Sequence, residues 1–389
     1  MSLLGRDEAW ELIAAHAAPL PAEETALGAA VGRRLARDVA SPIDIPGFDR
    51  SAMDGYALRA ADAPGRLRVF GEVAAGGGAE QPVVPGTAVR IFTGGAMPPG
   101  ADAVEKQEVA ERDGEHVVLG APVLPGQHVR TRGEDVPRGT TLLRAGDPVT
   151  VQSLTALAGA GLAAVAVHRP ARVAILLTGD ELVPPGRPLG PGQIHETSGT
   201  TLRALAERAG AEVLDMGTAP DDPGAIANRV QLGLHRADVL LVAGGVSVGE
   251  HDHVKGALEG AGVQQLFWGV RIKPGKPLFC GRRGAKWAFG LPGNPLSGVV
   301  SFLVFVEPLL RRMHGEAGAV ERRIRMTTTL PIRAMDGRTT YFTARFGPDG
   351  ATPTEQQGSA MTLALAGADG FVIADRDVPA GAEVDALPL

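Results

Sequence analysis

From Arg172 onward, apolar runs typical of buried strands alternate with segments whose apolar residues recur at helical spacing. The strand-like runs are RVAILLT, AEVLDMG, DVLLVAGG and KWAFGLPG, which begin at Arg172, Ala211, Asp238 and Lys286. Helical spacing is found at Leu202, Leu205, Ala206 and Ala209, and again at Ile226, Val230 and Leu234. Another helix is predicted to begin at Pro295 and to end near Pro308. This order of strands and helices predicts a parallel, doubly wound α/β sheet.

The remaining sequence predicts a multidomain α/β plus β protein. Residues 41–140 are rich in Pro and Gly, with short strands at Arg66–Phe70 and Ala88–Thr93, and predict a β-rich lid domain. Residues 1–40 and 141–170 are expected to pack together as a helical connecting domain. Residues 171–318 form the predicted α/β domain. A small C-terminal β-barrel is predicted over residues 319–389, where turn signals occur at Asp336-Gly337, Asp349-Gly350 and Asp369-Gly370.

Charge, aromatic content and cysteine content exclude several classes of protein. The net charge is −6 and aromatic residues make up only 4% of the chain, so the sequence does not suggest a nucleic-acid partner. A single cysteine, Cys280, cannot form an intrachain disulfide and fits a reducing compartment. The longest apolar run, from Leu296 to Val306, is too short to span a bilayer, and the N-terminus lacks a signal-peptide pattern. We therefore expect a cytoplasmic protein without a membrane partner.

Three of the predicted strands run directly into polar or Gly-rich turns. These turns are TGDEL (Thr178–Leu182), AGGVSVGEHD (Ala243–Asp252) and LPGNP (Leu291–Pro295). In a doubly wound sheet, ligands bind outside the carboxyl ends of the strands. The sequence therefore predicts a site where these turns meet.

A stiff basic segment, RIKPGKP, lies between the second and third of these turns. It carries Arg271, Lys273 and Lys276, with two prolines and a glycine between the lysines and after them. Cations on a rigid loop suit a phosphate or another oxyanion, because little entropy is lost when they bind it. An ordinary solvated basic turn explains the same composition equally well.

Acidic residues occur in two of the turns. Asp180 and Glu181 could bind a metal, anchor a hydroxyl or supply protons, or could simply be acids at a helix N-terminus. Glu250 and Asp252 would repel a phosphate unless Mg²⁺ lay between them. His251 and His253 flank Asp252, but two histidines on a loop are a weak indication of zinc. In LPGNP, Gly293 allows close approach to a ligand, and Asn294 could cap the helix that Pro295 begins.

The predicted lid domain has three polar loops on a rigid scaffold, a common location for binding residues. The segment SPIDIPGFDRSAMDGYAL (Ser41–Leu58) carries Asp44, Asp49 and Asp54. IFTGGAMPPGADAV (Ile91–Val104) and TRGEDV (Thr131–Val136) add Thr93, Gly94, Arg132, Glu134 and Asp135. Physical arguments alone do not name their ligand.

Seven of these motifs together resemble one family. SAMDGYA, FTGGAMPPGADAV, RGEDV, LLTGDEL, GGVSVGEHD, IKPGKP and LPGNP occur in this order over roughly residues 40 to 310. The chain is similar to the molybdopterin molybdenumtransferases, the family that includes the E domain of gephyrin. The α/β part alone also resembles molybdopterin adenylyltransferases and a competence-associated family. SAMDGY and the C-terminal barrel separate this chain from both.

The resemblance implies a homodimer of four-domain subunits, with the site between the α/β domain of one subunit and the SAMDGY domain of the other. Such enzymes take adenylylated molybdopterin and molybdate, with Mg²⁺, and give molybdenum cofactor and AMP. Other proteins of cofactor biosynthesis are further expected partners.

Carried over to individual residues of this sequence, the resemblance implies three groups of site residues. The catalytic candidates are Asp54, Glu181, Thr93 and Asp135, and protonation of the departing oxygen is a role open to Asp54 or Glu181. The substrate-binding candidates are Asp180, Gly244, Gly245, Ser247, Gly249, Asp221, Arg271, Lys273, Lys276, Pro292, Gly293 and Pro295. The candidates for Mg²⁺ are Asp252 and Glu250.

The chain departs from its relatives at two positions. Many relatives carry Lys where this chain has Gly269, and many have Asn where it has Ser198. Arg271 lies two residues after Gly269, so in an extended segment its side chain would point to the same side and could replace the missing lysine.

Two alternatives to molybdenum insertion come from the resemblance. A tungsten-inserting paralogue fits the same residues, because tungstate and molybdate differ little in size or charge. A non-catalytic scaffold of the same fold is the second alternative. It is disfavoured because Asp54, Glu181, Asp252, Lys273 and Lys276 are all present.

Overall fold

The computed structural model describes residues 3–245 and 253–389. The chain divides into two units, which are described separately. Unit 1 comprises Met1–Glu23, Gly32–Ala36 and Val167–Leu389, and unit 2 comprises Glu24–Val31 and Arg37–Ala166.

Unit 1 is built around a six-stranded sheet with the strand order β16-β13-β17-β21-β20-β18. These strands are β13 (Arg172–Thr178), β16 (Glu212–Ala219), β17 (Val239–Ala243), β18 (Gln264–Trp268), β20 (Phe279–Arg283) and β21 (Lys286–Leu291). The first four strands in this order are parallel, and β20 runs antiparallel to both of its neighbours. The predicted parallel α/β sheet is therefore confirmed.

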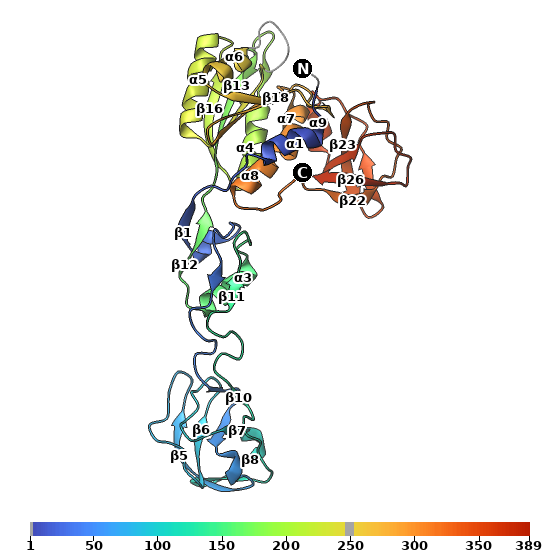
Figure 1. Cartoon of the computed structure of the whole chain (residues 1–389). Helices are drawn as coiled ribbons and strands as arrows, with labels where there is room; N and C mark the ends of the chain where they lie inside the picture. Colours follow the sequence, from blue (N-terminus) through green and yellow to red (C-terminus); the bar gives the residue numbers. More distant parts are fainter. Residues whose placement is uncertain (1–2, 246–252) are drawn as a thin grey trace. The chain divides into compact units, whose positions relative to one another are not determined.

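Helices cover both faces of this sheet (Figure 1). Along β13, alternate side chains point to opposite faces, so Val173 and Ile175 join one core while Ala174 and Leu176 join the other. The first core contains α1 (Arg6–Ala14), α4 (Ser198–Arg208), α7 (Pro295–Ser301) and α8 (Glu307–Met313). The second contains α5 (Pro223–Arg236) and α6 (His253–Gly260). Because both faces are buried, the strands have continuous apolar sequences.

The helix that begins at Pro295 continues beyond the predicted end near Pro308. A π-helical turn, Phe302–Val306, joins α7 to α8, which runs to Met313. The prediction was wrong because this turn changes the hydrogen-bonding pattern just before Pro308. Pro308 thus occupies the first turn of α8, where its missing N–H is tolerated.

The C-terminal part of unit 1 is a second six-stranded sheet, with the order β19-β23-β25-β26-β22 and β24 paired to β23. Its strands are β19 (Ile272–Lys273), β22 (Ile324–Thr327), β23 (Thr339–Gly347), β24 (Gly350–Pro353), β25 (Gly370–Ala374) and β26 (Glu383–Pro388). The short helix α9 (Thr362–Ala366) precedes β25. The edge strand β19 comes from the RIKPGKP segment, so this basic segment belongs to both parts of unit 1.

Unit 2 contains a third six-stranded sheet, with the order β7-β4-β6-β5-β9-β8. Its strands are β4 (Gly55–Leu58), β5 (Gly65–Val73), β6 (Thr87–Ile91), β7 (Ala103–Lys106), β8 (Ala110–Asp113) and β9 (His116–Leu119). Short 3₁₀ turns occur at Ala60–Asp62 and Gln107–Val109. Apolar clusters pack against both faces of the sheet.

The remaining elements are short. The helices are α2 (Leu27–Ala30) and α3 (Val151–Gly159), and α3 begins at a capping box formed by Thr150 and Ser153. The strand pairs are β1 (Ala22–Ala26) with β12 (Ala164–His168), β2 (Val39–Ala40) with β11 (Thr141–Leu143), β3 (Arg50–Ser51) with β10 (Val129–Arg130), and β14 (Leu182–Val183) with β15 (Ile194–His195).

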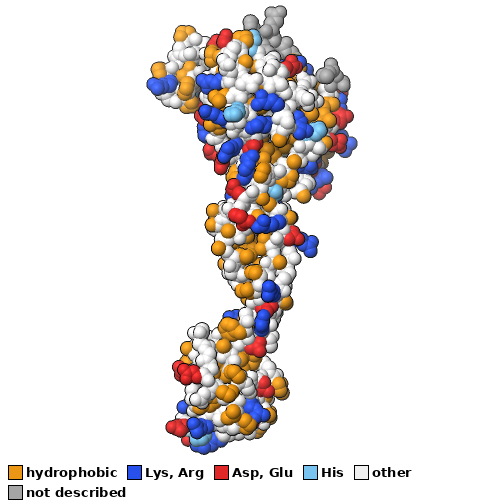
Figure 2. Space-filling model, turned by 60° about the vertical axis from the view of Figure 1, so that its left-hand side comes forward, with side chains coloured by type: hydrophobic (Ala, Val, Ile, Leu, Met, Phe, Trp, Pro, Cys, Tyr) orange, Lys and Arg blue, Asp and Glu red, His pale blue; other side chains and the backbone are white. Residues whose placement is uncertain are grey.

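Within the described residues, no helix is both long and apolar enough to cross a membrane. Charged side chains of both signs are distributed over the surface visible in Figure 2.

Candidate active site

The carboxyl ends of β13, β17 and β21 lie at one edge of the α/β sheet, because these strands are parallel neighbours. The turns that follow them surround a cavity of about 630 Å³. Of the predicted site residues, those that line it are Glu181, Asp221, Gly244, Gly245, Pro292, Gly293 and Pro295. The structure thus brings together residues from all three predicted turns.

The floor of the cavity is a close contact between two strand ends. Gly244 has a φ of 99°, and a Cβ there would lie 2.5 Å from the carbonyl oxygen of Thr178. Only glycine fits this position. Thr178 is 4% exposed and lines the cavity, yet its hydroxyl has no hydrogen-bond partner within the described part of the chain. A buried, unsatisfied hydroxyl is costly, so this group is available to bind a ligand.

Asp180 and Asp221 are joined by reciprocal hydrogen bonds. The backbone N–H of Asp221 donates to Oδ1 of Asp180 at 3.2 Å, and that of Asp180 donates to Oδ2 of Asp221 at 3.4 Å. These bonds hold the turn after β13 beside the turn after β16. Asp221 lines the cavity, whereas Asp180 does not.

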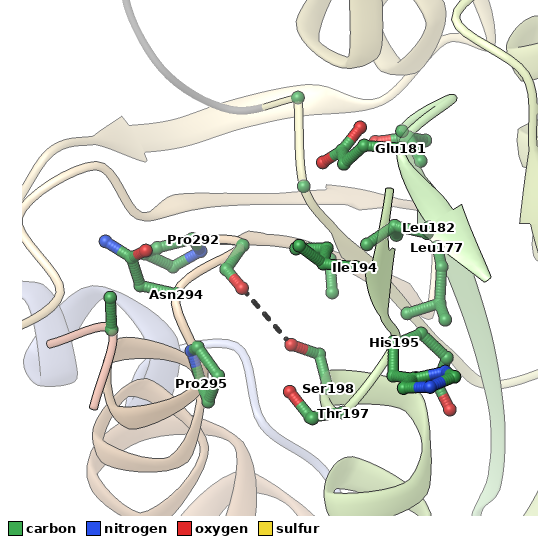
Figure 3. Close-up of a pocket in the computed structure, with 18 of the residues that line it drawn as sticks. Leu177, Glu181, Leu182, Ile194, His195, Thr197, Ser198, Pro292, Asn294 and Pro295 are labelled. Atoms are coloured by element: carbon green, nitrogen blue, oxygen red, sulfur yellow. Dashed lines mark hydrogen bonds between the residues drawn. The ribbon is translucent and has the colours of Figure 1, made fainter. Parts of the chain in front are cut away.

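Glu181 is not an acid at a helix N-terminus, which was the alternative explanation of TGDEL. The chain continues from it into β14, and α4 begins only at Ser198. Glu196 fills the expected role instead, because its carboxylate accepts from the N–H of Gly199 at 2.8 Å and from the hydroxyl of Thr200 at 2.9 Å. Glu181 is therefore left facing the cavity (Figure 3).

Ser198, where the resemblance led us to expect Asn, also lines the cavity. Its hydroxyl donates to the carbonyl oxygen of Gly293 at 3.3 Å, which ties the start of α4 to the LPGNP turn (Figure 3). Asn294 is the N-cap residue of α7, but its side chain makes no capping hydrogen bond. The expected side-chain cap is therefore wrong, and the Asn294 amide donates instead to the hydroxyl of Ser359 at 3.2 Å.

A second cavity, of about 430 Å³, adjoins the first and shares Pro277, Pro292 and Asn294 with it. Its cationic lining residues are Lys273, Lys276 and Arg338. The first two come from the predicted basic segment, whereas Arg338 comes from the turn before β23. Pairing of Lys273 with Thr340 in the C-terminal sheet places the two sources side by side.

Arg271 lines neither of these two cavities. Its guanidinium donates to the carbonyl oxygen of Leu3 at 3.0 Å and lies 3.5 Å from the carboxylate of Glu8. The extended geometry assumed for this segment is wrong, because Gly269 has a φ of 89°. A Cβ at Gly269 would also lie 2.5 Å from Cδ2 of Leu3, so the Leu3 side chain would have to shift to accommodate a lysine here.

In unit 2, Asp54 and Thr93 form a pair. The backbone N–H and the hydroxyl of Thr93 both donate to Oδ1 of Asp54, at 2.8 and 2.7 Å. These two bonds, and then the charge of Arg90, hold the pKa of Asp54 below its ordinary value. Asp54 is thus ionised at neutral pH and suited to accept hydrogen bonds or to face a cation.

Two aromatic rings hold the guanidinium group of Arg90 near the Asp54–Thr93 pair. Its guanidinium carbon lies 5.3 Å from the ring centroids of both Tyr56 and Phe92, and Nη1 donates to the Tyr56 hydroxyl at 3.2 Å. Tyr56 follows Asp54 by two residues, and Phe92 precedes Thr93. The same cation is therefore fixed by both segments that carry the pair.

Asp44 and Asp49, the other two aspartates of the Ser41–Leu58 segment, organise the RGEDV turn. Arg132 donates to Asp44 at 2.6 Å through its side chain and to Asp49 at 2.7 Å through its backbone N–H. Asp135 is exposed, and its backbone N–H donates to the carbonyl oxygen of Ile45. Asp44 and Asp49 thus shape the loop, while the Asp135 side chain faces solvent.

Three family models match nearly the whole chain in order. They are the MoeA N-terminal region (domain I and II) at residues 4–161, the probable molybdopterin binding domain at residues 174–312, and the MoeA C-terminal region (domain IV) at residues 325–389. A molybdopterin molybdenumtransferase of Haemophilus influenzae is 41% identical over 302 residues, which cover 77% of this chain and 74% of the relative. The chain belongs to the molybdopterin molybdenumtransferase family.

Other members of the family match over more of this chain. A molybdopterin molybdenumtransferase of Synechococcus elongatus is 34% identical over 380 residues, 93% of this chain and 92% of the relative. The crystal structure of the molybdopterin biosynthesis MoeA protein from Pyrococcus horikosii matches with a TM-score of 0.90 and 31% identity, covering 100% of this chain and 99% of that one. The multidomain fold expected from the resemblance is thus confirmed.

Four predicted residues of this family member lie outside the described residues. They are Ser247, Gly249, Glu250 and Asp252, so both predicted Mg²⁺ ligands remain predictions. Within residues 3–245 and 253–389, no group of three His, Cys, Asp or Glu side chains is arranged to hold a metal ion.

Thr178, Arg338 and Ser359 are among the polar residues at the two cavities that sequence reasoning missed. Thr178 ends a predicted strand and could have been found from that position. Arg338 and Ser359 come from the C-terminal sheet, far along the sequence from the KPGKP segment. No local motif indicates their proximity: the pairing of β19 with β23 brings Arg338 to the site, and hydrogen bonds with Asn294 and Leu296 bring Ser359 there.

Proposed function

We propose that this protein inserts molybdenum from molybdate into adenylylated molybdopterin, with release of AMP. Relatives named molybdopterin molybdenumtransferase align with most of the chain, and the structural neighbour covers all of it. The observation that carries the proposal is the pair of adjoining cavities, one lined by carboxylates and glycines and the other by three cations.

Molybdate is assigned to the cation-lined cavity. It is a tetrahedral dianion, and Lys273, Lys276 and Arg338 supply charge-assisted hydrogen bonds from rigid backbone. Pro274 and Pro277 stiffen the basic segment, and strand pairing fixes Lys273. A site organised before binding loses little entropy when the anion enters.

The adenylylated pterin is assigned to the larger cavity at the strand ends. Its volume suits a ligand of that size, since typical ligand pockets span about 300–1,000 Å³. Backbone at Gly244 and Gly245 can approach a phosphate closely. The unsatisfied hydroxyl of Thr178 supplies a further hydrogen bond at the floor of the cavity. The shared wall at Pro292 places the two ligands next to each other.

The insertion step requires proton transfer. When a dithiol replaces one oxo ligand, two Mo–S bonds form, the bonds to that oxygen break, and the oxygen leaves as water with the two thiol protons. Glu181, which faces the cavity, is placed to relay these protons. Asp54 is held ionised by Thr93, so its role is acceptance or electrostatic stabilisation and not proton donation. Cleavage of the phosphoanhydride consumes one water and releases AMP.

Magnesium is the proposed cofactor, with Glu250 and Asp252 as predicted ligands. The described lining of the larger cavity fits this ion, because it carries the carboxylates of Glu181 and Asp221 and neither Lys nor Arg. Bound Mg²⁺ would offset the charge of the substrate phosphates, whose oxygens would complete its coordination.

We propose that a homodimer completes the site. Asp54 of the partner subunit, hydrogen-bonded to Thr93 of the partner subunit, would face the substrate. Mixing two inactive variants, Asp54→Asn and Lys276→Ala, tests this directly. If one site draws on both subunits, random mixing restores about one quarter of wild-type activity, because half of the dimers then have one intact site. Absence of any restoration, with exchange of subunits verified, would contradict a composite site.

The proposed reaction is tested with purified protein, adenylylated molybdopterin, molybdate and Mg²⁺. We expect AMP release together with cofactor that activates an apo-molybdoenzyme. Equal AMP release in excess chelator would contradict the magnesium role. Replacing molybdate by tungstate in the same assay distinguishes the two metals.

A further inference from the structure

A cavity of about 190 Å³ in unit 1 is lined by charged side chains that the proposed reaction does not use. It lies where α4 and α8 end, beside Ala171 at the start of β13, whose N–H donates to His314. The candidate active site is at the opposite, carboxyl end of the same strand. The arginines that line the cavity are Arg33, Arg34, Arg208, Arg311 and Arg322, and its acidic lining residue is Glu316.

One of these arginines, Arg208, differs from the others because it has no carboxylate partner among the described residues. Arg34 and Arg311 share Glu316, while Arg33 pairs with Glu23 and Arg322 with Glu307. Arg208, in the last turn of α4, is exposed and forms no ion pair with any residue that the structure describes. Arg208 thus leaves at the cavity a positive charge that no carboxylate of the described residues pairs with.

The two histidines at the cavity do not offset this charge. Burial, and then the nearby charge of Arg33, lower the pKa of His314 to about 4, so its ring is neutral at physiological pH. Nδ1 of His168 lies 2.6 Å from the carbonyl oxygen of Leu20, which can only accept. Nδ1 is therefore the donor in this hydrogen bond.

We propose that this cavity binds a tetrahedral oxyanion of the phosphate class, held mainly by Arg208 together with the Arg34 and Arg311 guanidinium groups. The planar guanidinium matches such an oxyanion in a bidentate way, and several can share one anion. A volume of about 190 Å³ is several times that of one water and suits a small oxyanion, not the large pterin substrate. The bound anion would link the ends of α4 and α8 to residues 32–36.

The test is isothermal titration calorimetry of the full-length protein with inorganic phosphate, at constant ionic strength set by chloride and without Mg²⁺. We expect saturable binding at millimolar concentrations. Arg208→Ala should weaken it by about tenfold or more, the usual effect of losing a charge-assisted contact. Arg203→Ala is the matched control, because it removes an arginine from the same helix that pairs with Asp215 outside the cavity. It should change affinity by less than about twofold.

Further variants exclude binding at the active site. If Lys276→Ala abolishes phosphate binding while Arg208→Ala leaves it unchanged, the anion occupies the substrate site and the proposal is overturned. Absence of phosphate binding by the wild-type protein also overturns the proposal. The arginines would then only stabilise the free backbone carbonyl groups at the ends of α4 and α8. Arg208-dependent binding of AMP or molybdate in parallel titrations supports the site and identifies the preferred tetrahedral anion.

Discussion

Asp180 and Asp221 exchange hydrogen bonds, each carboxylate accepting from the backbone N–H of the other residue. Two loops far apart in the sequence are thereby joined at one sheet edge, and the Asp221 carboxylate is held at the cavity. Since two carboxylates lie close together here, the arrangement suits a bound cation.

This relationship predicts different effects for two substitutions at one position. Asp221→Asn keeps an oxygen acceptor for Asp180 and removes the charge, so we expect a near wild-type melting temperature with reduced kcat/KM. Asp221→Ala also removes the acceptor, which costs about 1 kcal/mol and lowers the melting temperature as well. Thermal melts and steady-state kinetics separate the two effects. Wild-type kinetics of Asp221→Asn would show that only the loop geometry matters.

The two acids of the proposed chemistry should behave as functional and not as structural residues. We expect Glu181→Gln and Asp54→Asn to keep the fold and to reduce molybdenum insertion about a hundredfold, the usual scale of lost acid–base or electrostatic catalysis. Metal content of the product cofactor measures insertion, and circular dichroism checks the fold. Asp222→Asn is the control for Glu181, because the Asp222 carboxylate caps α5 and does not line the cavity. Insertion at the wild-type rate by either variant removes that residue from the mechanism.

The parallel sheet was predictable because buried strands on both faces give continuous apolar runs such as β13 and β17. It was also predictable that the turns after these strands meet, because parallel strands end at the same edge of a sheet. The sequence did not indicate that Lys273 pairs with Thr340, because a two-residue strand has no periodicity. The positive φ at Gly269 and the π-helical turn before Pro308 were also missed.

Two arginines can be compared as candidates for anion binding. Arg338 lines the cavity with Lys273 and Lys276, whereas Arg271 contacts Glu8 and Leu3. We expect Arg338→Ala to weaken molybdate binding about ten- to hundredfold. Arg271→Ala should leave molybdate affinity near the wild-type value. Equilibrium dialysis with molybdate measures both. The reverse order would restore Arg271 as the substitute for the lysine that the resemblance led us to expect at position 269.

The depressed pKa of His314 predicts how stability depends on pH. Burial and the charge of Arg33 lower this pKa from 6.5 to about 4, while in the unfolded chain it returns to its ordinary value. Between these two values the unfolded state binds a proton that the folded state does not. The stabilisation is therefore complete above pH 6.5 and is lost as the pH falls toward 4. One pKa unit corresponds to about 1.4 kcal/mol, so His314 alone should lower the free energy of unfolding by about 3 kcal/mol over this range.

Urea unfolding of the wild-type protein and His314→Gln, measured from pH 7 to pH 4, tests this expectation. The glutamine oxygen can still accept from the N–H of Ala171, which His314 accepts at 2.9 Å in the wild-type protein. Because glutamine does not titrate, the variant should lose less stability than the wild type as the pH falls. Parallel pH profiles for the two proteins would mean that His314 does not titrate between these values in the folded state. The acid sensitivity would then come from carboxylates in ion pairs, such as Asp238 with Arg169.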